Sequence, residues 1–225
     1  MAAGAAAAWY ASTQLPNKEH VVPEYMAESK PIMMGGEWTK SHALGEGEGL
    51  LIPMELASQL AGDGIRYEEA TDSVILTTQS QVLHFQIGKT DATLNNKPFS
   101  LQFAATHHNG QVYLPLAPFR ELFGFQAEEA PETGIVSIYV PDEAIQQGEI
   151  PQQSEKGAAL RTGPGKHYPI VEDMMPGSLL HIRGEEDGWY RVQSGTGHIG
   201  YVAKKDALLT SVEKIPKLPE EKPFI

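Results

Sequence analysis

Four aromatic side chains with polar tips gather in the last third of the chain. They are Tyr168, Trp189, Tyr190 and Tyr201, and Asp187 and Arg191 flank the tryptophan in sequence. Such rings bind sugar faces or extended peptides well, because they bury apolar area while keeping one hydrogen-bonding end. The two charged neighbours could orient a peptide. These six residues are the candidate ligand-binding set; the alternative is that the rings are structural, with Trp189 and Tyr201 plugging a small core.

A metal site is the second chemistry to consider, because the chain has eight histidines. His107-His108 is the best pair, but adjacent residues on a strand point apart and no third ligand lies close in sequence. We expect solvated histidines in a hairpin that turns at Asn109-Gly110. The chain lacks cysteine, so thiolate ligands and disulfides are excluded. We predict no metal and no cofactor. The other histidines on strands, expected to face outward between apolar neighbours, are His84, His181 and His198.

Carboxylates are abundant but form no catalytic pair by pattern. Glu68-Glu69 and Glu128-Glu129 occupy matching places in a repeated pattern, which predicts two solvated acidic surfaces rather than one active site. A glycosidase holds two carboxylates about 5–10 Å apart across a cleft, and no signature marks such a pair. Gly163-Pro164-Gly165 lacks the Lys-Ser/Thr end and the following helix of a phosphate loop. We therefore predict no catalytic residues and no enzyme activity.

Composition limits the partners. The chain has 225 residues, 41% of them apolar, and its Pro and Gly punctuation favours two domains over one. Its formal net charge is −12, with 13 acidic and 4 basic residues between Glu48 and Glu143 but 7 of each between Pro151 and Thr210. Nothing resembles the basic stripe that phosphate contacts need, so nucleic acid is excluded as a partner. Anionic lipid and teichoic acid are disfavoured for the same reason.

The elements that position the aromatic set are short. Between Leu160 and Leu208, runs of β-branched and aromatic residues alternate with Gly and Pro, which predicts a small barrel of short strands and tight turns. Such a barrel has no room for a buried catalytic centre, so this region indicates a binding module. The residues that carry the pattern are Leu160-Arg161-Thr162-Gly163-Pro164-Gly165, Tyr168-Pro169, Pro176-Gly177, Gly188-Trp189-Tyr190-Arg191-Val192 and Gly200-Tyr201-Val202.

This pattern resembles the bacterial SH3-like domain, the cell-wall-targeting module of many secreted bacterial hydrolases. The resemblance covers about a quarter of the chain and implies that Tyr168, Trp189, Tyr190 and Tyr201 cluster at one end of the barrel. Two departures from the family pattern stand out. Leu160 directly precedes Arg161, and the tip at Ser194-Gly195-Thr196-Gly197 is rich in glycine. They leave the fold expectation intact but blur which loop would touch a ligand.

Residues 31–141 show two copies of one pattern, offset by about 60 to 62 residues. Each copy reads hairpin, strand, short helix, hairpin, and a fixed offset over five elements predicts a tandem repeat. Turns that need positive φ are expected at Gly35-Gly36 and Asn95-Asn96. The expected segments are the strands 50–53 and 112–115, the helices 54–60 and 117–123, the closing strands 65–67, 74–76, 125–127 and 135–138, and an additional strand 82–87. The fold class is thus an α+β tandem-repeat domain of antiparallel strands with short helices, followed by a small all-β SH3-like barrel.

The repeat resembles the stalk domain at the N-terminus of some bacterial copper amine oxidases, which recurs as a surface module in Gram-positive spore formers. The resemblance rests on Val112 to Leu116, Phe123-Gly124 and Thr133 to Ile138, with Ile52-Pro53-Met54 and Thr71 to Leu76 in the first copy. Copper and the modified-tyrosine cofactor belong to the catalytic domain of those oxidases. The resemblance therefore implies no oxidase activity here.

The two ends suggest a longer parent protein. Ala-rich residues before Trp9 and Tyr10 are interpreted either as the outer end of a membrane anchor or as a cloning remnant with a frayed tail. The C-terminal Pro, Lys and Glu residues read as a solvated linker to a further domain. The predicted organisation is a tail at 1–30, the stalk-like domain at 31–141, a linker at 142–156, the SH3-like domain at 157–209 and a second linker at 210–225.

These features predict an extracellular fragment of a cell surface or cell wall. Its function would be to bind peptidoglycan, through the peptide or the glycan, and to act as a spacer. The order of modules resembles the non-catalytic front half of a cell-wall-active hydrolase and implies a family 18 glycoside hydrolase domain after Ile225. The alternative is a surface protein–protein interaction or dimerisation module without a wall ligand. Ligand identity, oligomeric state and the angle between modules do not follow from the sequence.

Overall fold

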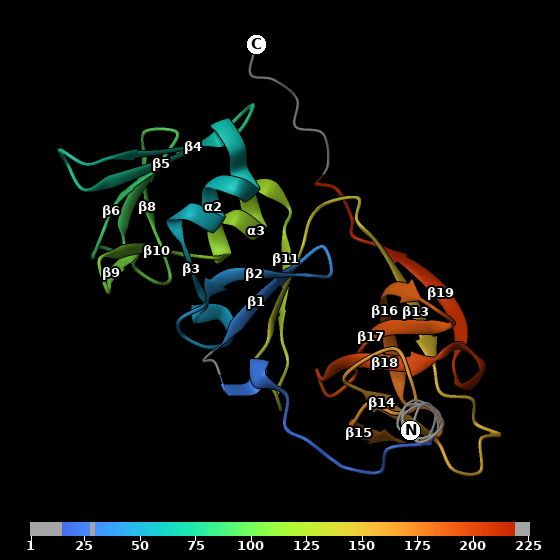
Figure 1. Ribbon diagram of the computed structural model, residues 1–225. Coiled ribbons are helices and arrows are strands. Elements are labelled where there is room, and N and C mark those ends of the chain that lie inside the picture. Colours follow the sequence, from blue (N-terminus) through green and yellow to red (C-terminus); the bar gives the residue numbers. More distant parts are fainter. Residues whose placement is uncertain (1–14, 28–29, 219–225) are drawn as a thin grey trace. The chain divides into compact units, whose positions relative to one another are not determined.

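A computed structural model describes residues 15–27 and 30–218, and within these residues the chain divides into two compact units (Figure 1). The seven-strand unit holds 15–27, 130–135 and 144–214. The two-helix unit holds 30–129, 136–143 and 215–218. Each unit has its own apolar core, so each is described separately below.

The two-helix unit is mostly β, with two short α-helices in its described part. Its elements in chain order are β1 (Pro31–Met34), β2 (Glu37–His42), η2 (Gly47–Gly49), β3 (Leu51–Pro53), α2 (Met54–Ala61), η3 (Gly62–Gly64), β4 (Ile65–Glu68), β5 (Ser73–Thr77), β6 (Val82–Gln86), β7 (Asp91–Leu94), β8 (Lys97–Ser100), β9 (Thr106–His108), β10 (Gln111–Pro115), α3 (Ala117–Phe123), β11 (Gln126–Glu129) and β12 (Val136–Tyr139). The order hairpin, strand, helix, hairpin thus occurs around α2 and again around α3. That the two halves are copies of one another stays a prediction.

Three sheets make up this unit, with strand orders β11-β12-β1-β2, β4-β5-β6-β7-β8 and β3-β10-β9. The first sheet joins the start of the unit to its end, because β1 pairs in parallel with β12 and places Ile32 opposite Val136. The third sheet pairs β3 with β10, the two strands that lead into the helices. Strands far apart in sequence are therefore neighbours in two of the three sheets.

Local chemistry explains the turns and helix ends. The predicted turns have positive φ, at 57° and 78° for Gly35 and Gly36 and at 51° and 61° for Asn95 and Asn96. Helix α3 carries Pro118 in its first turn, where the missing N–H would have no helical acceptor. It ends at Gly124, whose φ of 74° is a left-handed cap.

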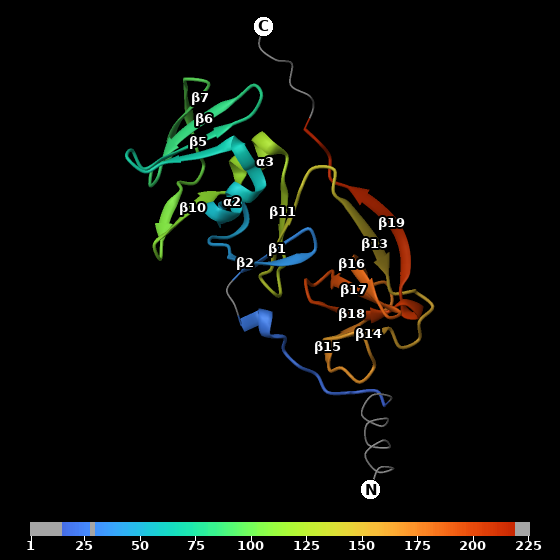
Figure 2. The same ribbon diagram turned by 45° about the horizontal axis from the view of Figure 1, so that its top comes forward.

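One core fills the two-helix unit. Helices α2 and α3 lie side by side in both ribbon views and contribute Leu56 and Phe119, which are at most 1% exposed (Figure 2). Phe119 and Phe123 stack at 5.9 Å between ring centroids, and Phe125 continues the stack. Apolar residues at helical spacing thus form the buried face of each helix.

The seven-strand unit has one sheet in the order β15-β14-β18-β17-β16-β13-β19. Its core is small and built from inward-facing residues such as Leu160, Val192 and Val202, all unexposed. Its elements in chain order are η1 (Glu24–Ala27), β13 (Ala144–Glu149), β14 (Ala158–Arg161), β15 (Ile170–Met174), β16 (Leu179–Glu186), β17 (Trp189–Ser194), β18 (Ile199–Ala203), η4 (Lys204–Asp206) and β19 (Leu208–Lys214).

The two segments treated as linkers contain strands. The segment 142–156 includes β13, and the segment 210–225 begins inside β19, which pairs with β13. Both strands are polar: Gln147 donates to Glu213 at 2.6 Å and accepts from the Ser211 hydroxyl at 2.8 Å. Because side-chain amides replace the usual apolar alternation here, the sequence pattern resembled a linker.

The N-terminal tail is also part of the fold where it is described. Ile170 donates its backbone N–H to Glu19 at 2.7 Å, and Val21 donates to Ile170 at 2.9 Å, so the tail adds to the edge strand β15. The Ala-rich stretch through Tyr10 lies outside the described residues. Within those residues, no helix combines the length and apolar character that a bilayer crossing requires.

Candidate functional site

Strand alternation separates the predicted aromatic set into two faces. Val192 on β17 and Val202 on β18 point into the core, so their neighbours in sequence point the other way. Trp189, Arg191 and Tyr201 therefore share the outward face, and Arg191 lies opposite Tyr201 in the β17–β18 register. Tyr190 is on the inward face, where it packs at the rim of the core. The structure brings together three of the six predicted residues on one surface.

Trp189 lines a groove of about 440 Å³, which we call the Trp189 groove. The ring is half-buried and contributes one wall. The other walls come from β14 and its flanking loops, the N-terminal segment, β15, the end of β18 and η4. The half-buried ring therefore lies beside an open groove and is not among the buried residues of the core. The lining residues are Pro16, Lys156, Gly157, Ala158, Ala159, Arg161, Lys166, Asp173, Trp189, Ala203, Lys205 and Asp206.

The rim of the Trp189 groove carries more cations than anions. Asp206 pairs with Lys205 at 2.7 Å, and Asp173 lies 2.7 Å from the ring nitrogen of His20. Lys156 and Lys166 are exposed and have no ion-pair partner in the part of the chain that the structure describes. In a chain of net charge −12, this groove is a local cationic site. Its chemistry suits a ligand with an apolar face and carboxylates.

Arg161 fixes one wall of the groove. It is only 8% exposed, and its Nη1 donates to the carbonyls of Asn17 at 2.9 Å and Tyr168 at 2.7 Å. Burial lowers the pKa of Arg161, and the charge of Asp173 opposes that shift. The guanidinium therefore anchors the N-terminal segment, whose Pro16 lines the groove, rather than facing a ligand.

The remaining two predicted residues lie in loops outside the groove lining. Tyr168 is 37% exposed, and its ring lies against that of His167 with 4.3 Å between the centroids and a tilt of 35°. The ring also covers Gly163, where an added Cβ would lie 2.7 Å from it, so this glycine is needed for close packing. Asp187 forms the β16–β17 turn with a φ of 46°. Neither residue lines the Trp189 groove.

The polar tips of the other predicted residues have partners within the unit. Lys204 Nζ lies 5.1 Å from the centre of the Tyr190 ring, and a hydrogen bond to Glu185 raises the pKa of this lysine. Arg191 donates to the Arg183 carbonyl at 3.3 Å. The Tyr201 hydroxyl donates to Glu186 at 3.4 Å. These contacts hold the outward face of β16–β18 in place beside Trp189.

Sequence reasoning missed the cations of the groove. Lys156 and Lys166 flank β14 on either side, and strand pairing brings this strand next to β18 and hence near Trp189. The charge count from Pro151 to Thr210 is balanced, which hides the local excess.

His198 differs from its prediction, because its side chain is only 14% exposed. It lies 3.0 Å from the Thr196 hydroxyl and 3.3 Å from Glu172, inside a polar network beneath the glycine-rich tip. Ser194 donates to Glu172 at 2.7 Å rather than to an imidazole, so the serine is not activated as a nucleophile.

Burial raises the pKa of Tyr25, whose hydroxyl accepts from the Ile199 N–H, to about 12. The network ties the N-terminal segment to β18. By contrast, His84 is exposed as predicted, and His181 is half-buried.

His107 also has a partner, since its Nε2 lies 3.0 Å from both carboxylate oxygens of Asp72. The hairpin turns at Asn109-Gly110 as predicted, with φ of 48° and 77°. Within the described residues, no group of three or more His, Cys, Asp or Glu side chains is arranged to hold a metal ion.

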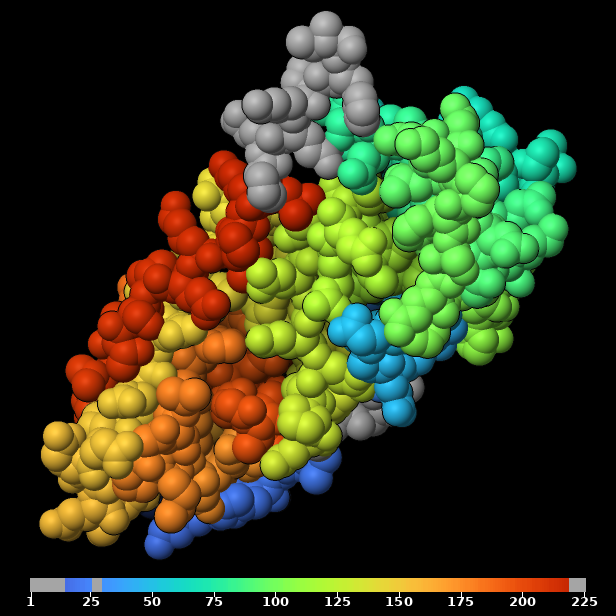
Figure 3. All heavy atoms as spheres, turned by 180° about the vertical axis from the view of Figure 1, so that it is seen from behind, coloured from blue at the N-terminus to red at the C-terminus, as the bar shows by residue number. Residues whose placement is uncertain are grey.

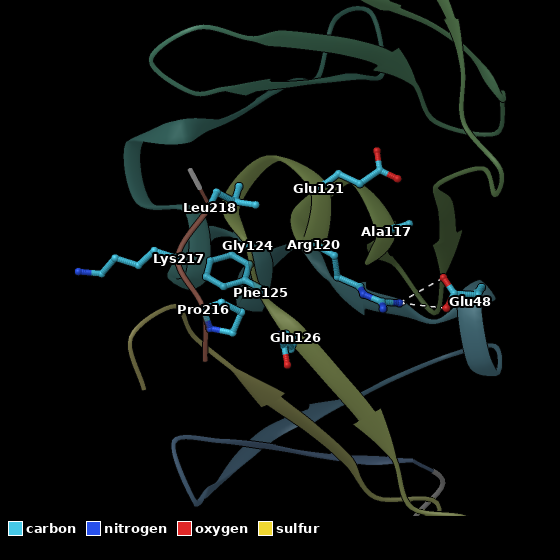
Figure 4. A pocket seen from close by; sticks show the side chains of 10 residues that line it. All are labelled: Glu48, Ala117, Arg120, Glu121, Gly124, Phe125, Gln126, Pro216, Lys217 and Leu218. Atoms are coloured by element: carbon cyan, nitrogen blue, oxygen red, sulfur yellow. Dashed lines mark hydrogen bonds and ion pairs between the residues drawn. The ribbon is translucent and has the colours of Figure 1, made fainter. Parts of the chain in front are cut away.

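A pocket of about 390 Å³ in the two-helix unit offers no comparable site (Figure 4). Arg120 of α3 faces Glu48 and donates to both of its carboxylate oxygens, at 3.1 and 3.2 Å. Leu218 packs against Gly124, where an added Cβ would lie 3.0 Å from its side chain. Arg120 and Glu48 thus pair with each other, Lys217 pairs with Asp142, and the chain itself covers the apolar end.

Comparison with known families supports both parts of the chain. Residues 36–138 match the family model of the copper amine oxidase N-terminal domain, and residues 156–207 match that of the bacterial SH3 domain. No curated protein matches the chain. Both matched domains are non-catalytic accessory domains, which fits an accessory or binding module. The chain therefore carries a copper amine oxidase N-terminal domain followed by a bacterial SH3 domain.

Proposed function

We propose that this chain is a non-catalytic region that binds peptidoglycan at the cell surface and acts as a spacer. The observation that carries the proposal is the Trp189 groove of the bacterial SH3 domain. In it a half-buried indole stands beside two lysines that have no ion-pair partner among the described residues. The resemblance to wall-targeting modules supports an extracellular location. The proposed ligand is the peptide of peptidoglycan, because its carboxylates match the cationic rim.

The test is co-sedimentation of the 225-residue protein with purified peptidoglycan. We expect the wild type to pellet and Trp189→Ala to lose at least tenfold in apparent affinity, because the ring supplies the apolar contact. Phe99→Ala, at an exposed ring of β8 in the other unit that does not line the Trp189 groove, is the matched control and should pellet like the wild type. Circular dichroism establishes that both variants are folded. Failure of the wild type to pellet, or equal retention of both variants, would overturn the proposal.

The proposal extends to the parent protein, which we infer to be a wall-active hydrolase with a family 18 glycoside hydrolase domain. The order of two accessory domains supports it, since such domains bring a catalytic domain to its substrate. The sequence of the parent gene tests this extension. A reading frame that encodes no hydrolase domain would refute the extension and leave wall binding by this region intact.

A second candidate function is dimerisation, and strand β19 favours it. All seven residues of this strand are exposed, and in the space-filling view β19 lies at the surface in red (Figure 3). Among the described strands, β19 pairs with β13 only, so one edge is unpaired, and Leu209 and Val212 are 44% and 58% exposed. An exposed strand edge with unpaired backbone groups can pair with another chain. Light scattering tests it: a dimer that Val212→Lys converts to monomer supports the candidate, and a monomeric wild type rejects it.

A further inference from the structure

The copper amine oxidase N-terminal domain contains a hollow of its own. It has a volume of about 380 Å³, lies between the edge strand β2 and helix α2, and is defined here as the Trp38 hollow. This size is within the range of small-molecule sites, which is about 300–1,000 Å³. The lining residues are Met34, Glu37, Trp38, Thr39, Lys40, Ser41, His42, Pro53, Glu55, Leu56, Gln59, Gln111 and Tyr113.

Two aromatic rings border this hollow at different depths. Trp38 is 41% exposed, which is unusual for the largest apolar side chain. Tyr113 is only 6% exposed, and His108 holds its ring edge-on at 5.9 Å between centroids. Leu56, which is 1% exposed, contributes apolar surface at depth. An exposed indole over an apolar base suits a flat ligand with an apolar face.

The rest of the lining is polar and of mixed hydrogen-bonding type. Glu55 and Gln59 lie four residues apart on α2, so they share one face of the helix, and both are exposed. Gln111 of β10 is exposed on the same hollow. Amides both donate and accept, and carboxylates accept, which together match a row of hydroxyl groups.

Charge and geometry narrow the ligand class. Glu37 and Glu55 outnumber Lys40, so an anionic ligand is disfavoured. Although Glu37, Glu55 and His42 line one hollow, no cluster suited to a metal ion exists among the described residues. A peptide that binds as an added strand needs a row of evenly spaced backbone hydrogen-bonding groups, and the irregular strand β2 does not provide one. Its register slips opposite Ile32, whose carbonyl accepts from the Thr39 hydroxyl at 2.9 Å.

We propose that the Trp38 hollow is a second binding site, for a neutral glycan whose sugar ring stacks on Trp38 while its hydroxyls meet Glu55, Gln59 and Gln111. This site is independent of the Trp189 groove and of its proposed peptide ligand. The two domains would then bind ligands of different chemistry: the bacterial SH3 domain a charged peptide, and the copper amine oxidase N-terminal domain an uncharged sugar.

The experiment titrates the 225-residue protein with two neutral probes, a hexamer of β-1,4-linked N-acetylglucosamine and a hexamer of β-1,4-linked glucose, by calorimetry. We expect at least one hexamer to bind, and Trp38→Ala to weaken it at least tenfold. Phe99→Ala, at an exposed ring of the same domain outside both the Trp38 hollow and the Trp189 groove, is the matched control and should bind within twofold of the wild type. Gln59→Ala tests the polar part of the site on an exposed helix position and should weaken binding about threefold. The ratio of the affinities for the two hexamers shows whether the site recognises the acetamido group.

Three outcomes would overturn the proposal. The first is that neither hexamer binds the folded wild type at millimolar concentration. The second is that Trp38→Ala and Phe99→Ala weaken binding equally. The third is that an extended peptide binds and Trp38→Ala weakens its binding, while neither hexamer binds. None of these depends on retention by peptidoglycan, because peptide binding in the Trp189 groove is measured by Trp189→Ala, so the two proposals fail separately.

Discussion

The Trp189 groove and the Trp38 hollow place the same side chain in opposite electrostatic settings. Beside Trp189, Lys156 and Lys166 stand without ion-pair partners among the described residues. Beside Trp38, the rim carries glutamates and glutamines, with Lys40 as its lysine. An indole contributes stacking to either site, so the residues around it select the charge of the ligand. The difference predicts a carboxylate-bearing ligand for the first site and an uncharged one for the second.

The supports of the two sites also differ. The Trp189 groove depends on a small core and on a segment far away in sequence, which Arg161 fastens through Asn17. The Trp38 hollow rests on the larger core of the two-helix unit, to which Leu56 of α2 belongs. A packing defect should therefore disable the groove more readily than the hollow.

The largest expected effect comes from Gly200, whose substitution should disable one site and spare the other. An added Cβ would lie 2.4 Å from the Arg161 carbonyl and 3.0 Å from Leu160, and neither can move without disturbing β14. We expect Gly200→Ala to destabilise the seven-strand unit by about 3 kcal/mol. Urea titration with hydrogen exchange read peptide by peptide measures it.

Gly195→Ala is the matched control, because its added Cβ would meet nothing closer than 3.9 Å. This variant should unfold like the wild type. Peptides from 31–125 should exchange normally in both variants. If Gly200→Ala loosened those peptides as much as its own, the two sites would share one folding unit and the comparison above would fail.

Substitution of Arg161 should have the next largest effect, because this residue holds the N-terminal segment that supports only the Trp189 groove. Arg161→Ala leaves the carbonyls of Asn17 and Tyr168 without their donor, and we expect a loss of about 2 kcal/mol in the seven-strand unit. The backbone N–H groups of Val21 and Ile170 should exchange faster. Arg161→Lys, which keeps the charge without the planar fork, should recover part of the loss. Unchanged exchange at Val21 would show that the N-terminal segment is held by other contacts.

Much of the fold was readable from sequence because its signals are local. The turns at Gly35-Gly36 and Asn95-Asn96 need positive φ, and Pro53 precedes a helix as expected. Strand β13 was predicted to be part of a linker, because its Gln146 and Gln147 make side-chain hydrogen bonds in place of apolar contacts. Its partner β19 is exposed along its whole length, so neither strand shows alternation.

The candidate site was only partly readable for a related reason. The Gly188-Trp189 pattern identified the ring, and strand alternation fixed its face once the core residue Val192 was known. Lys156 and Lys166 come from the loops on either side of β14, and strand order rather than sequence spacing brings them near Trp189. The Trp38 hollow was missed because its polar lining joins β2, α2 and β10, three elements that are separated in sequence.

Charge reversal sharpens the electrostatic contrast directly. Lys156→Glu with Lys166→Glu should weaken retention on peptidoglycan about tenfold, and added salt should weaken the wild type in the same direction. The matching reversal Glu37→Lys, on the rim but outside the proposed sugar contacts, should change the binding of neutral hexamers less than threefold, because an uncharged ligand does not sense the sign of the rim. Equal salt dependence of both ligands would remove the distinction between the two sites.

The smallest expected effect is a pH response confined to the two-helix unit. The Tyr67 hydroxyl donates to Asp72 at 2.7 Å, and this bond, helped by His107, holds the pKa of Asp72 below its ordinary value. A lowered carboxyl pKa stabilises the fold at pH values above the ordinary pKa of about 3.9, and that contribution disappears as the pH falls through the lowered value. Tyr67→Phe removes the main cause, so the carbon NMR titration midpoint of Asp72 should rise.

His107→Ala should raise the same midpoint by less, because its contribution is the smaller of the two hydrogen bonds. The binding of neutral hexamers should stay constant over this pH range in both variants, since no residue proposed to contact the sugar belongs to this hydrogen-bonded group. If the Asp72 midpoint stayed fixed in Tyr67→Phe, the carboxylate would be held by solvent and not by the tyrosine. Low pH would then affect the two units differently only through ligand binding. A carboxylate-bearing peptide loses its charge near pH 4, whereas a neutral sugar has no charge to lose.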